Sequence, residues 1–259
     1  MIEAQDLRPA PFARLKAAAS RFGRALLDVA LPPQCLACSR PVSDQGGLCV
    51  ACWGEFKPIE RPFCERLGTP FPADFGAGLV SPKALARPPA WDRARAVARF
   101  DGAARTLVHR LKYGDGLHLA RAMGGMMARA GHELLGADAL LVPTPLHRGR
   151  LWRRRFNQSA MLARAAAEAS GAQLALQALE RVKATRPQVG LTAAQRADNL
   201  AGAFRVSEEG RALIAGRRVV LVDDVLTTGA TLDRLARLAR RAGAASVDAL
   251  VFAVVVNDG

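Results

Sequence analysis

The chain has 259 residues, of which 50% are hydrophobic, and its formal net charge is +14. This length is enough for one large domain and one small one. No uninterrupted apolar run of about 18 residues is present, which argues against a membrane-spanning helix. Nearly all the basic residues are arginines, which fits either a polyanion-binding surface or GC-biased codon usage. The charge alone does not choose between these explanations.

The N-terminal segment, residues 1–31, is expected to contain a basic amphipathic helix over 11–31. Apolar residues recur there at helical spacing until Pro32-Pro33 ends the pattern. The apolar run Ala25-Leu26-Leu27 is interrupted by Asp28, which is not typical of a secretory signal peptide. We therefore expect a cytoplasmic protein.

Residues 32–68 are rich in cysteine and predict a small zinc ribbon. Two Cys-x-x-Cys pairs lie ten residues apart, and together they supply Cys35, Cys38, Cys49 and Cys52. A two-residue gap lets both thiolates of a pair face one tetrahedral ion, so the set predicts a structural Zn²⁺ site. The alternatives are two thiol pairs without metal, or a redox pair, although a redox function normally needs only one such motif. Cys64 is left over and is expected to be a free or partly buried thiol.

A stretch rich in Pro and Gly, residues 69–91, is expected to be a linker, and residues 92–259 to form an α/β domain. No internal repeat stands out. The patterns predict alternating elements as follows: a strand over 94–100, helices over 103–113 and 117–134, a strand over 139–142, a helix over 157–170, a strand over 217–222, a helix over 231–242 and a strand over 247–256. The continuous apolar strands indicate a mostly parallel sheet covered on both faces.

The most informative segment is the run Val219-Val220-Leu221-Val222-Asp223-Asp224-Val225-Leu226-Thr227-Thr228-Gly229-Ala230-Thr231. It places two carboxylates at the end of a buried strand, and a small-residue turn and a helix start follow them. Ligands bind at this edge of open α/β sheets, where a helix N-terminus favours anions. Two other interpretations compete. One is a Walker-B-like strand, which would need a Gly-Lys-Ser/Thr element that is missing here; the other is an ordinary turn with a capping threonine.

This run resembles the binding motif for 5-phosphoribosyl-1-pyrophosphate (PRPP) of type I phosphoribosyltransferases. The resemblance implies that Asp223 and Asp224 contact the ribose hydroxyls and act as the catalytic pair, with Mg²⁺ bridging the ribose and the pyrophosphate. It also implies that the 5′-phosphate is held by the turn, which consists of Thr227, Thr228, Gly229, Ala230 and Thr231.

Motifs in the middle of the chain resemble those of ComF-type competence proteins. They are the stretch from Val142-Pro143-Thr144-Pro145 to Arg150, then Arg154-Arg155-Phe156-Asn157-Gln158, and the series Thr185, Gln188, Leu191, Arg196, Asn199 and Gly202-Ala203-Phe204. With the cysteine pairs, the likeness covers residues 32–256.

The two middle segments supply further candidate residues. In a loop over 143–150, the side chains of His147, Arg148 and Arg150 are suited to the charge of a departing pyrophosphate. Gln188 and Arg196 lie in a segment that resembles a loop closing over PRPP. Each basic loop residue also has the ordinary interpretation of a solvated side chain, and Lys112, near a helix end, is either a further contact or a surface lysine.

Two departures from the family pattern are visible. The family often shows a second Cys-x-x-Cys-Gly, but here Cys64 is followed by Leu67-Gly68, so this half-site is lost. The usual glycine before Phe-Asn-Gln is Arg155, which puts the fold of that loop in question.

The sequence leaves two functions open. One is an enzyme, a phosphoribosyltransferase acting on PRPP with Mg²⁺ and an acceptor that the sequence does not identify. The other is a non-catalytic module that uses the same fold to handle single-stranded DNA during DNA uptake. The resemblance implies competence proteins as partners, and an oligomer is compatible with it.

Overall fold

The computed structural model describes residues 32–74, 76, 78–113, 116–183 and 202–256. The expected N-terminal helix over 11–31 lies outside the described residues. No helix among the described residues is both long and apolar enough to cross a membrane.

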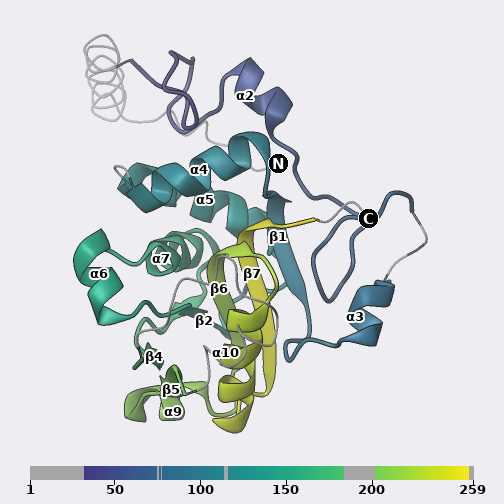
Figure 1. The fold of residues 1–259 in the computed structure, drawn as a ribbon, viewed down its shortest axis with the longest axis vertical. Helices are drawn as coiled ribbons and strands as arrows, with labels where there is room; N and C mark the ends of the chain where they lie inside the picture. Colours follow the sequence, from purple (N-terminus) through teal and green to yellow (C-terminus); the bar gives the residue numbers. More distant parts are fainter. Residues whose placement is uncertain (1–31, 75, 77, 114–115, 184–201, 257–259) are drawn as a thin grey trace, which may run out of the picture.

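A five-stranded sheet forms the centre of the protein (Figure 1). Its strands lie in the order β1-β7-β6-β2-β3, and every neighbouring pair is parallel. The strands are β1 (Ala94–Arg99), β2 (Ala139–Pro143), β3 (Gln173–Leu174), β6 (Arg218–Leu226) and β7 (Ser246–Val254). The inner strands are almost wholly buried, which explains their continuous apolar sequence. The predicted α/β class with a mostly parallel sheet is confirmed.

Helices cover both faces of the sheet and create two hydrophobic cores. Val220 and Val222 of β6 pack with three helices on one face, and Val219 and Leu221 pack with α10 on the other. This alternation is the two-residue period of a strand. The helices of the first face are α4 (Gly102–Tyr113), α5 (Gly116–Ala130) and α7 (Gln158–Ser170), and α10 spans Ala230–Arg241.

Strands β2 and β6 lie next to each other at the switch point of the sheet. After β2 the chain continues to β3 on one side, whereas after β6 it continues to β7 on the other side. The two connections therefore diverge, and a crevice opens outside the carboxyl ends of these strands, where open α/β sheets bind ligands.

Several elements differ from the sequence-based expectations. Residues 148–154 form a helix, α6, so the prediction of a loop over 143–150 is wrong in its second part. Strand β6 continues to Leu226 and contains both aspartates, because β7 pairs with it as far as Val254. The pattern also missed short elements: α2 (Val50–Glu55), α3 (Pro82–Ala86), β4 (Leu179–Arg181), its antiparallel partner β5 (Phe204–Val206) and α9 (Glu208–Ile214).

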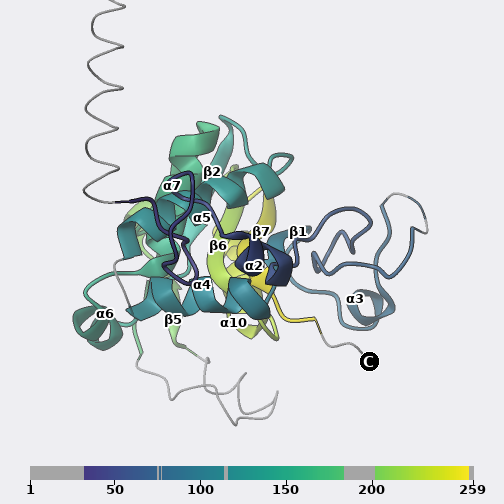
Figure 2. The same ribbon diagram turned by 90° about the horizontal axis from the view of Figure 1, so that it is seen from above.

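The cysteine-rich unit carries α2 and lies beside α4, at one end of the molecule (Figures 1 and 2). Its Phe56 is buried in the same core as α4 and α5, with ring centroids 6.4 Å from Phe252 of β7. The chain then passes along β1, where the N–H of Ile59 donates to the carbonyl of Val97 at 2.9 Å. The segment that carries α3 lies on the opposite side of the sheet from α6 in both views.

Candidate functional site

Asp223 and Asp224 lie near the carboxyl end of β6 and are held by different partners. The hydroxyl of Ser159 donates to Oδ1 of Asp223 at 2.8 Å, and the N–H of Asp224 donates to the same oxygen at 2.9 Å. Asp224 is only 5% exposed, and its Oδ2 lies 2.6 Å from Nζ of Lys112, in the last turn of α4. The structure therefore brings together two adjacent carboxylates, one hydroxyl and one ammonium group.

The surroundings of the pair raise the pKa of one carboxyl, that of Asp223. Burial raises the pKa of Asp223, and the adjacent charge of Asp224 raises it further, to about 7, although the hydrogen bond from Ser159 opposes the shift. A carboxyl with this pKa changes its protonation near neutral pH, so a small change in its surroundings decides whether it accepts or donates hydrogen bonds.

The turn after β6 has a shape that only glycine allows at its centre. Gly229 has φ +80°, and a Cβ placed on it would lie 2.7 Å from Cη2 of the buried Trp91. Gly229 is also the N-cap of α10, where no side chain caps the helix. Thr227 and Thr228 are exposed beside it, and a small hollow is lined by Asp223 and residues 225–232. A helix N-terminus with hydroxyls around it suits an anion.

The connection after β2 is tied to this turn through Asn157. The N–H of Thr144 donates to the carbonyl of Val222 at 2.8 Å, and Nδ2 of Asn157 donates to the carbonyl of Thr144 at 3.0 Å. Oδ1 of Asn157 caps α7 by accepting from the N–H of Ser159, the residue whose hydroxyl holds Asp223. The Phe-Asn-Gln motif therefore joins both edges of the crevice.

The buried hydroxyl of Thr144 lies in the connection that Asn157 anchors. Its Oγ1 has no hydrogen-bond partner among the residues that the structure describes. An unpaired buried hydroxyl is unfavourable unless it binds something, so this atom offers a ligand one further hydrogen bond.

The basic residues after β2 form the start of α6. His147 is the N-cap of this helix, and its Nδ1 accepts from the N–H of Gly149 at 3.2 Å. Arg148 is exposed in the first turn, and Arg150 also belongs to the helix. Gln188 and Arg196, the candidates for a closing loop, lie outside the described residues.

Arg155 ends α6 in a left-handed conformation, with φ +64°. The family glycine that it replaces adopts such a conformation readily, whereas a residue with a Cβ does so less easily. The backbone at Arg155 therefore has the left-handed conformation that a glycine adopts most readily.

Sequence reasoning missed three residues of the site or left them undecided. From the sequence, Lys112 could equally be a site residue or a surface lysine, and neither Ser159 nor Trp91 was predicted to belong to the site. Ser159 follows the Phe-Asn-Gln motif directly, so its position beside a known motif was a usable signal. Trp91 carried no signal, because its contact with Gly229 joins residues far apart in the chain.

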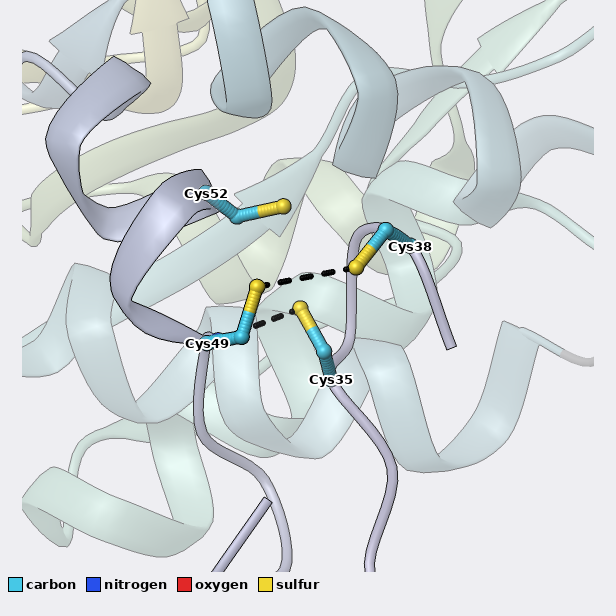
Figure 3. Close-up of side chains that lie close together, drawn as sticks. All are labelled: Cys35, Cys38, Cys49 and Cys52. Atoms are coloured by element: carbon cyan, nitrogen blue, oxygen red, sulfur yellow. Dashed lines mark hydrogen bonds between the residues drawn. The ribbon is translucent and has the colours of Figure 1, made fainter. Parts of the chain in front are cut away.

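The four predicted cysteine ligands form a separate cluster, in which their side chains point toward one another (Figure 3). Their sulfurs all lie within 4.8 Å of one another, and those of Cys38 and Cys49 are 3.6 Å apart. A tetrahedral Zn²⁺ with Zn–S bonds of about 2.3 Å separates its sulfurs by about 3.8 Å. The residues present therefore fit a Cys₄ zinc site, and all four coordination positions are filled by protein.

The surroundings of Cys35 lower the pKa of its thiol. Burial alone would raise the pKa of Cys35, but N–H donors led by that of Cys49 lower it to about 6. That N–H lies 3.3 Å from the Cys35 sulfur. The thiolate is the form that binds a metal, so this knuckle favours ligation. Burial and the three other sulfurs raise the pKa of Cys52 in the absence of an ion.

Comparison with known families matches both parts of the chain. Residues 26–83 match the double zinc ribbon domain family, and residues 162–258 match the phosphoribosyl transferase domain family.

Two named bacterial proteins are similar to most of the chain. The "DNA utilization protein YhgH" of Escherichia coli K12 is 32% identical over 224 residues, which are 84% of this chain and 95% of that protein. The "Competence protein F" of Haemophilus influenzae is 29% identical over 77% of this chain and 86% of its own length.

Solved structures give only distant likenesses. One titled as the allosteric regulatory enzyme of purine biosynthesis is 22% identical, covers 56% of this chain and 30% of its own, and has a TM-score of 0.38. The protein TT1426 of Thermus thermophilus is 20% identical, covers 54% of this chain and 85% of its own, and has a TM-score of 0.32. Likenesses at this level say nothing about activity.

Proposed function

The chain belongs to the ComF-type family of double zinc ribbon and phosphoribosyltransferase proteins, and from this premise we propose that it binds PRPP with Mg²⁺ in the service of DNA utilization or uptake. The observation that carries the proposal is the pairing of Asp223 and Asp224 with an uncapped helix N-terminus at the switch point of the sheet. Adjacent carboxylates suit a vicinal diol, and the helix start suits a phosphate.

In this proposal each part of PRPP has its own group of residues. The carboxylates of Asp223 and Asp224 accept hydrogen bonds from the ribose hydroxyls, and the turn Thr227–Thr231 holds the 5′-phosphate. The pyrophosphate lies toward the connection after β2, near Thr144, His147 and Arg148. The carboxylates of Asp223 and Asp224 are oxygen ligands of the kind that Mg²⁺ prefers, and a bound Mg²⁺ would offset the negative charge of the pyrophosphate.

The proposed reaction is transfer of the phosphoribosyl group. The bond between ribose C1 and the pyrophosphate oxygen breaks, and its electron pair leaves with the pyrophosphate. An acceptor then gives an electron pair to C1 and loses a proton. Arginines at the start of α6, Arg148 and Arg150, stabilise the charge of the leaving group. Gln188 and Arg196 belong to the segment that would close over the substrate and exclude water. The cytoplasmic location stays a prediction.

Calorimetric titration with PRPP and Mg²⁺ tests this proposal. The double variant Asp223→Asn/Asp224→Asn removes both charges and should weaken binding by tenfold or more, because one charge-assisted hydrogen bond contributes roughly 1.5–3 kcal/mol. The matched control is Asp44→Asn/Asp74→Asn, which makes the same charge change at two exposed positions. PRPP affinity that is equal in all three proteins would refute the site.

A second candidate function, binding of single-stranded DNA, is supported by the surface of α6. Trp152 is 87% exposed there and lines an open pocket with Arg148, Leu151 and Arg155. An exposed indole can stack on one base while neighbouring arginines contact phosphates. Aromatic residues make up only 5% of the sequence, so an extended stacking platform is not expected.

Fluorescence anisotropy with a labelled single strand tests this second function. Trp152→Ala should weaken binding several-fold, because stacking contributes roughly 1–3 kcal/mol per base. Arg155→Ala should lower the salt slope by about one unit. Trp53→Ala removes another exposed tryptophan, on α2, and should have no effect. If the strand does not bind even at low salt, the DNA function is rejected and the arginine content reflects composition.

A further inference from the structure

The hydrogen bonds of the cysteine-rich unit occur twice along the chain, in residues 33–56 and again in residues 62–87. We propose that residues 62–87 are a second ribbon that has lost its zinc and is held by packing against the sheet instead. No repeat is evident in the sequence, because the residues that would reveal it are those that have changed. Residues 69–87, for which the Pro- and Gly-rich sequence predicts a linker, then belong to this second ribbon.

The first half of each ribbon is a knuckle around one cysteine. Gln34 and Pro41 form a bridge around Cys35, and Phe63 and Pro70 form the same bridge around Cys64. Three backbone hydrogen bonds of the first knuckle have counterparts in the second. Cys35 N–H donates to Arg40 O (2.8 Å), as Cys64 N–H donates to Thr69 O (2.8 Å), and Ser39 N–H donates to Cys35 O (2.9 Å), as Gly68 N–H donates to Cys64 O (2.8 Å). Val42 N–H donates to Pro33 O (2.9 Å), as Phe71 N–H donates to Pro62 O (2.9 Å).

The backbone conformation at the end of the knuckle agrees as well. Ser39 and Gly68, each four residues after the cysteine, are left-handed with φ +61° and +63°. A left-handed serine is uncommon. That Ser39 has this conformation at the position equivalent to Gly68 supports a shared fold of the two knuckles.

The second halves also correspond. Leu36 N–H donates to Gly47 O at 3.0 Å, as Glu65 N–H donates to Leu79 O at 3.0 Å. Cys49 N–H donates to the Cys35 sulfur at 3.3 Å, as Ser81 N–H donates to the Cys64 sulfur at 3.2 Å. Cys49 and Ser81 are then the N-caps of the short helices α2 and α3. Ser81 therefore stands where Cys49 stands in the first ribbon.

This register identifies what has replaced the zinc ligands. Leu67 takes the position of Cys38, Ser81 that of Cys49 and Ala84 that of Cys52, and only Cys64 is retained. One thiol among an isobutyl group, a hydroxyl and a methyl group cannot form a Cys₄ site, so the second half of the double zinc ribbon does not fit a zinc ion. Cys64 and Ala84 are at most 1% exposed. Buried apolar side chains therefore replace the metal at the centre of the second ribbon.

Contacts with the sheet supply the stability that a metal would otherwise give. Arg95 of β1 is 2% exposed and binds the carboxylates of both Glu65 and Glu133, while its guanidinium lies 4.6 Å from the centre of the Phe63 ring. The knuckle also approaches β1 closely, because a Cβ on Gly68 would lie 2.9 Å from the carbonyl oxygen of Ala94. A buried charge needs its partners, so these contacts fix the second ribbon on β1.

The second ribbon also supports the turn after β6. The carbonyl of Arg66, inside the knuckle, accepts from Nε1 of Trp91 at 2.7 Å, and the Trp91 ring lies beneath Gly229. The metal-free ribbon thus positions the indole that shapes this turn, a role that requires rigidity but no metal.

Restoring the ligands tests the proposal by metal analysis. The wild-type protein should hold about one zinc per chain after washing with a weak chelator. The variant Leu67→Cys/Ser81→Cys/Ala84→Cys should hold two, because it completes the second set of thiols. The matched control, Leu67→Cys/Ser81→Cys/Leu85→Cys, moves the last thiol to an exposed position and should hold one. Two zinc ions in the wild type, or one in the folded triple variant, would overturn the proposal.

Hydrogen exchange on the wild-type chain decides the matter if the triple variant does not fold. After zinc is removed with a strong chelator, amides of residues 35–52 should lose protection, whereas those of residues 64–84 should keep it. If both ribbons lose protection together, the second one depends on metal and the proposal is wrong.

Discussion

The ammonium group of Lys112 lies 2.6 Å from Oδ2 of Asp224, so the last turn of α4 supplies the counter-charge for a buried carboxylate of β6. Asp224 is 5% exposed, and a buried charge without a partner is strongly unfavourable. Lys112 is partly exposed, so solvent screens part of the attraction. The pair joins the helix layer to the carboxyl edge of the sheet.

Replacing Lys112 should therefore destabilise the protein. We expect Lys112→Met to lower the free energy of unfolding by about 1–3 kcal/mol and Asp224→Asn in the same background to restore part of the loss. Urea unfolding measures both effects. Lys57→Met removes an exposed lysine that pairs with Asp101 at 3.3 Å and should change stability by less than about 1 kcal/mol. Equal effects of the two lysine variants would contradict the prediction.

Gly229→Ala should damage both stability and ligand binding. The left-handed φ disfavours a Cβ by about 1–2 kcal/mol, and the contact with Trp91 forces the turn to move. PRPP affinity should fall at least about tenfold. Gly216→Ala is the control, because Gly216 has φ +70° and a Cβ added there would meet nothing within 4 Å. This variant therefore measures the cost of the left-handed backbone without a steric clash. Calorimetry and thermal unfolding on both variants separate the two contributions.

The raised pKa of Asp223 makes stability depend on pH in a defined direction. Between the unfolded pKa of 3.8 and the folded value of about 7, the folded protein keeps a proton that the unfolded chain has lost. The contribution of this carboxyl to stability is therefore fully present below pH 4, declines as the pH rises and levels off above pH 7. Asp223→Asn cannot lose a proton, so its stability relative to wild type should increase from pH 5 to pH 8. A difference that stays constant over this range would disprove the shift.

Loss of a zinc ligand should affect the first ribbon only. Cys52→Ser should remove the zinc and expose the amides of residues 34–56 to exchange, because a structural zinc contributes on the order of 10 kcal/mol to a small unit. Cys64→Ser should leave the zinc content unchanged, since Cys64 lies in the second ribbon, outside the four-sulfur cluster. Metal analysis of the two variants is sufficient. Retention of zinc by Cys52→Ser would remove this residue from the ligand set.

Arg155→Gly should stabilise the protein by about 1 kcal/mol, because the position is already left-handed and exposed. The comparison is Arg121→Gly, an exposed position inside α5, where glycine should destabilise by about 1 kcal/mol. The two changes remove the same side chain, so opposite shifts in melting temperature report the backbone alone. A loss of stability at both positions would show that the Arg155 side chain matters more than its φ.

Local pattern was enough to predict the elements and chemistry that depend on neighbouring residues. The apolar run before Asp223 predicted a buried parallel strand, and the spacing of Cys35, Cys38, Cys49 and Cys52 predicted four converging sulfurs. In both cases the governing distance spans a few residues, so periodicity and knuckle geometry suffice. The pattern ended β6 too early, because charged residues are rare in buried strands and nothing local shows that β7 continues beside them.

Only the tertiary structure decided which distant residues meet. Lys112 reaches Asp224, and Trp91 lies beneath Gly229, because the sheet places β1, β7 and β6 side by side although they are far apart in the chain. The sequence marked only a lost half-site at Cys64 and did not predict the fold of the second ribbon. Its other metal ligands have become Leu67, Ser81 and Ala84, while its backbone hydrogen bonds persist. A backbone fold can be kept after its metal-binding side chains have been replaced, because packing against β1 supplies free energy that the metal would otherwise provide.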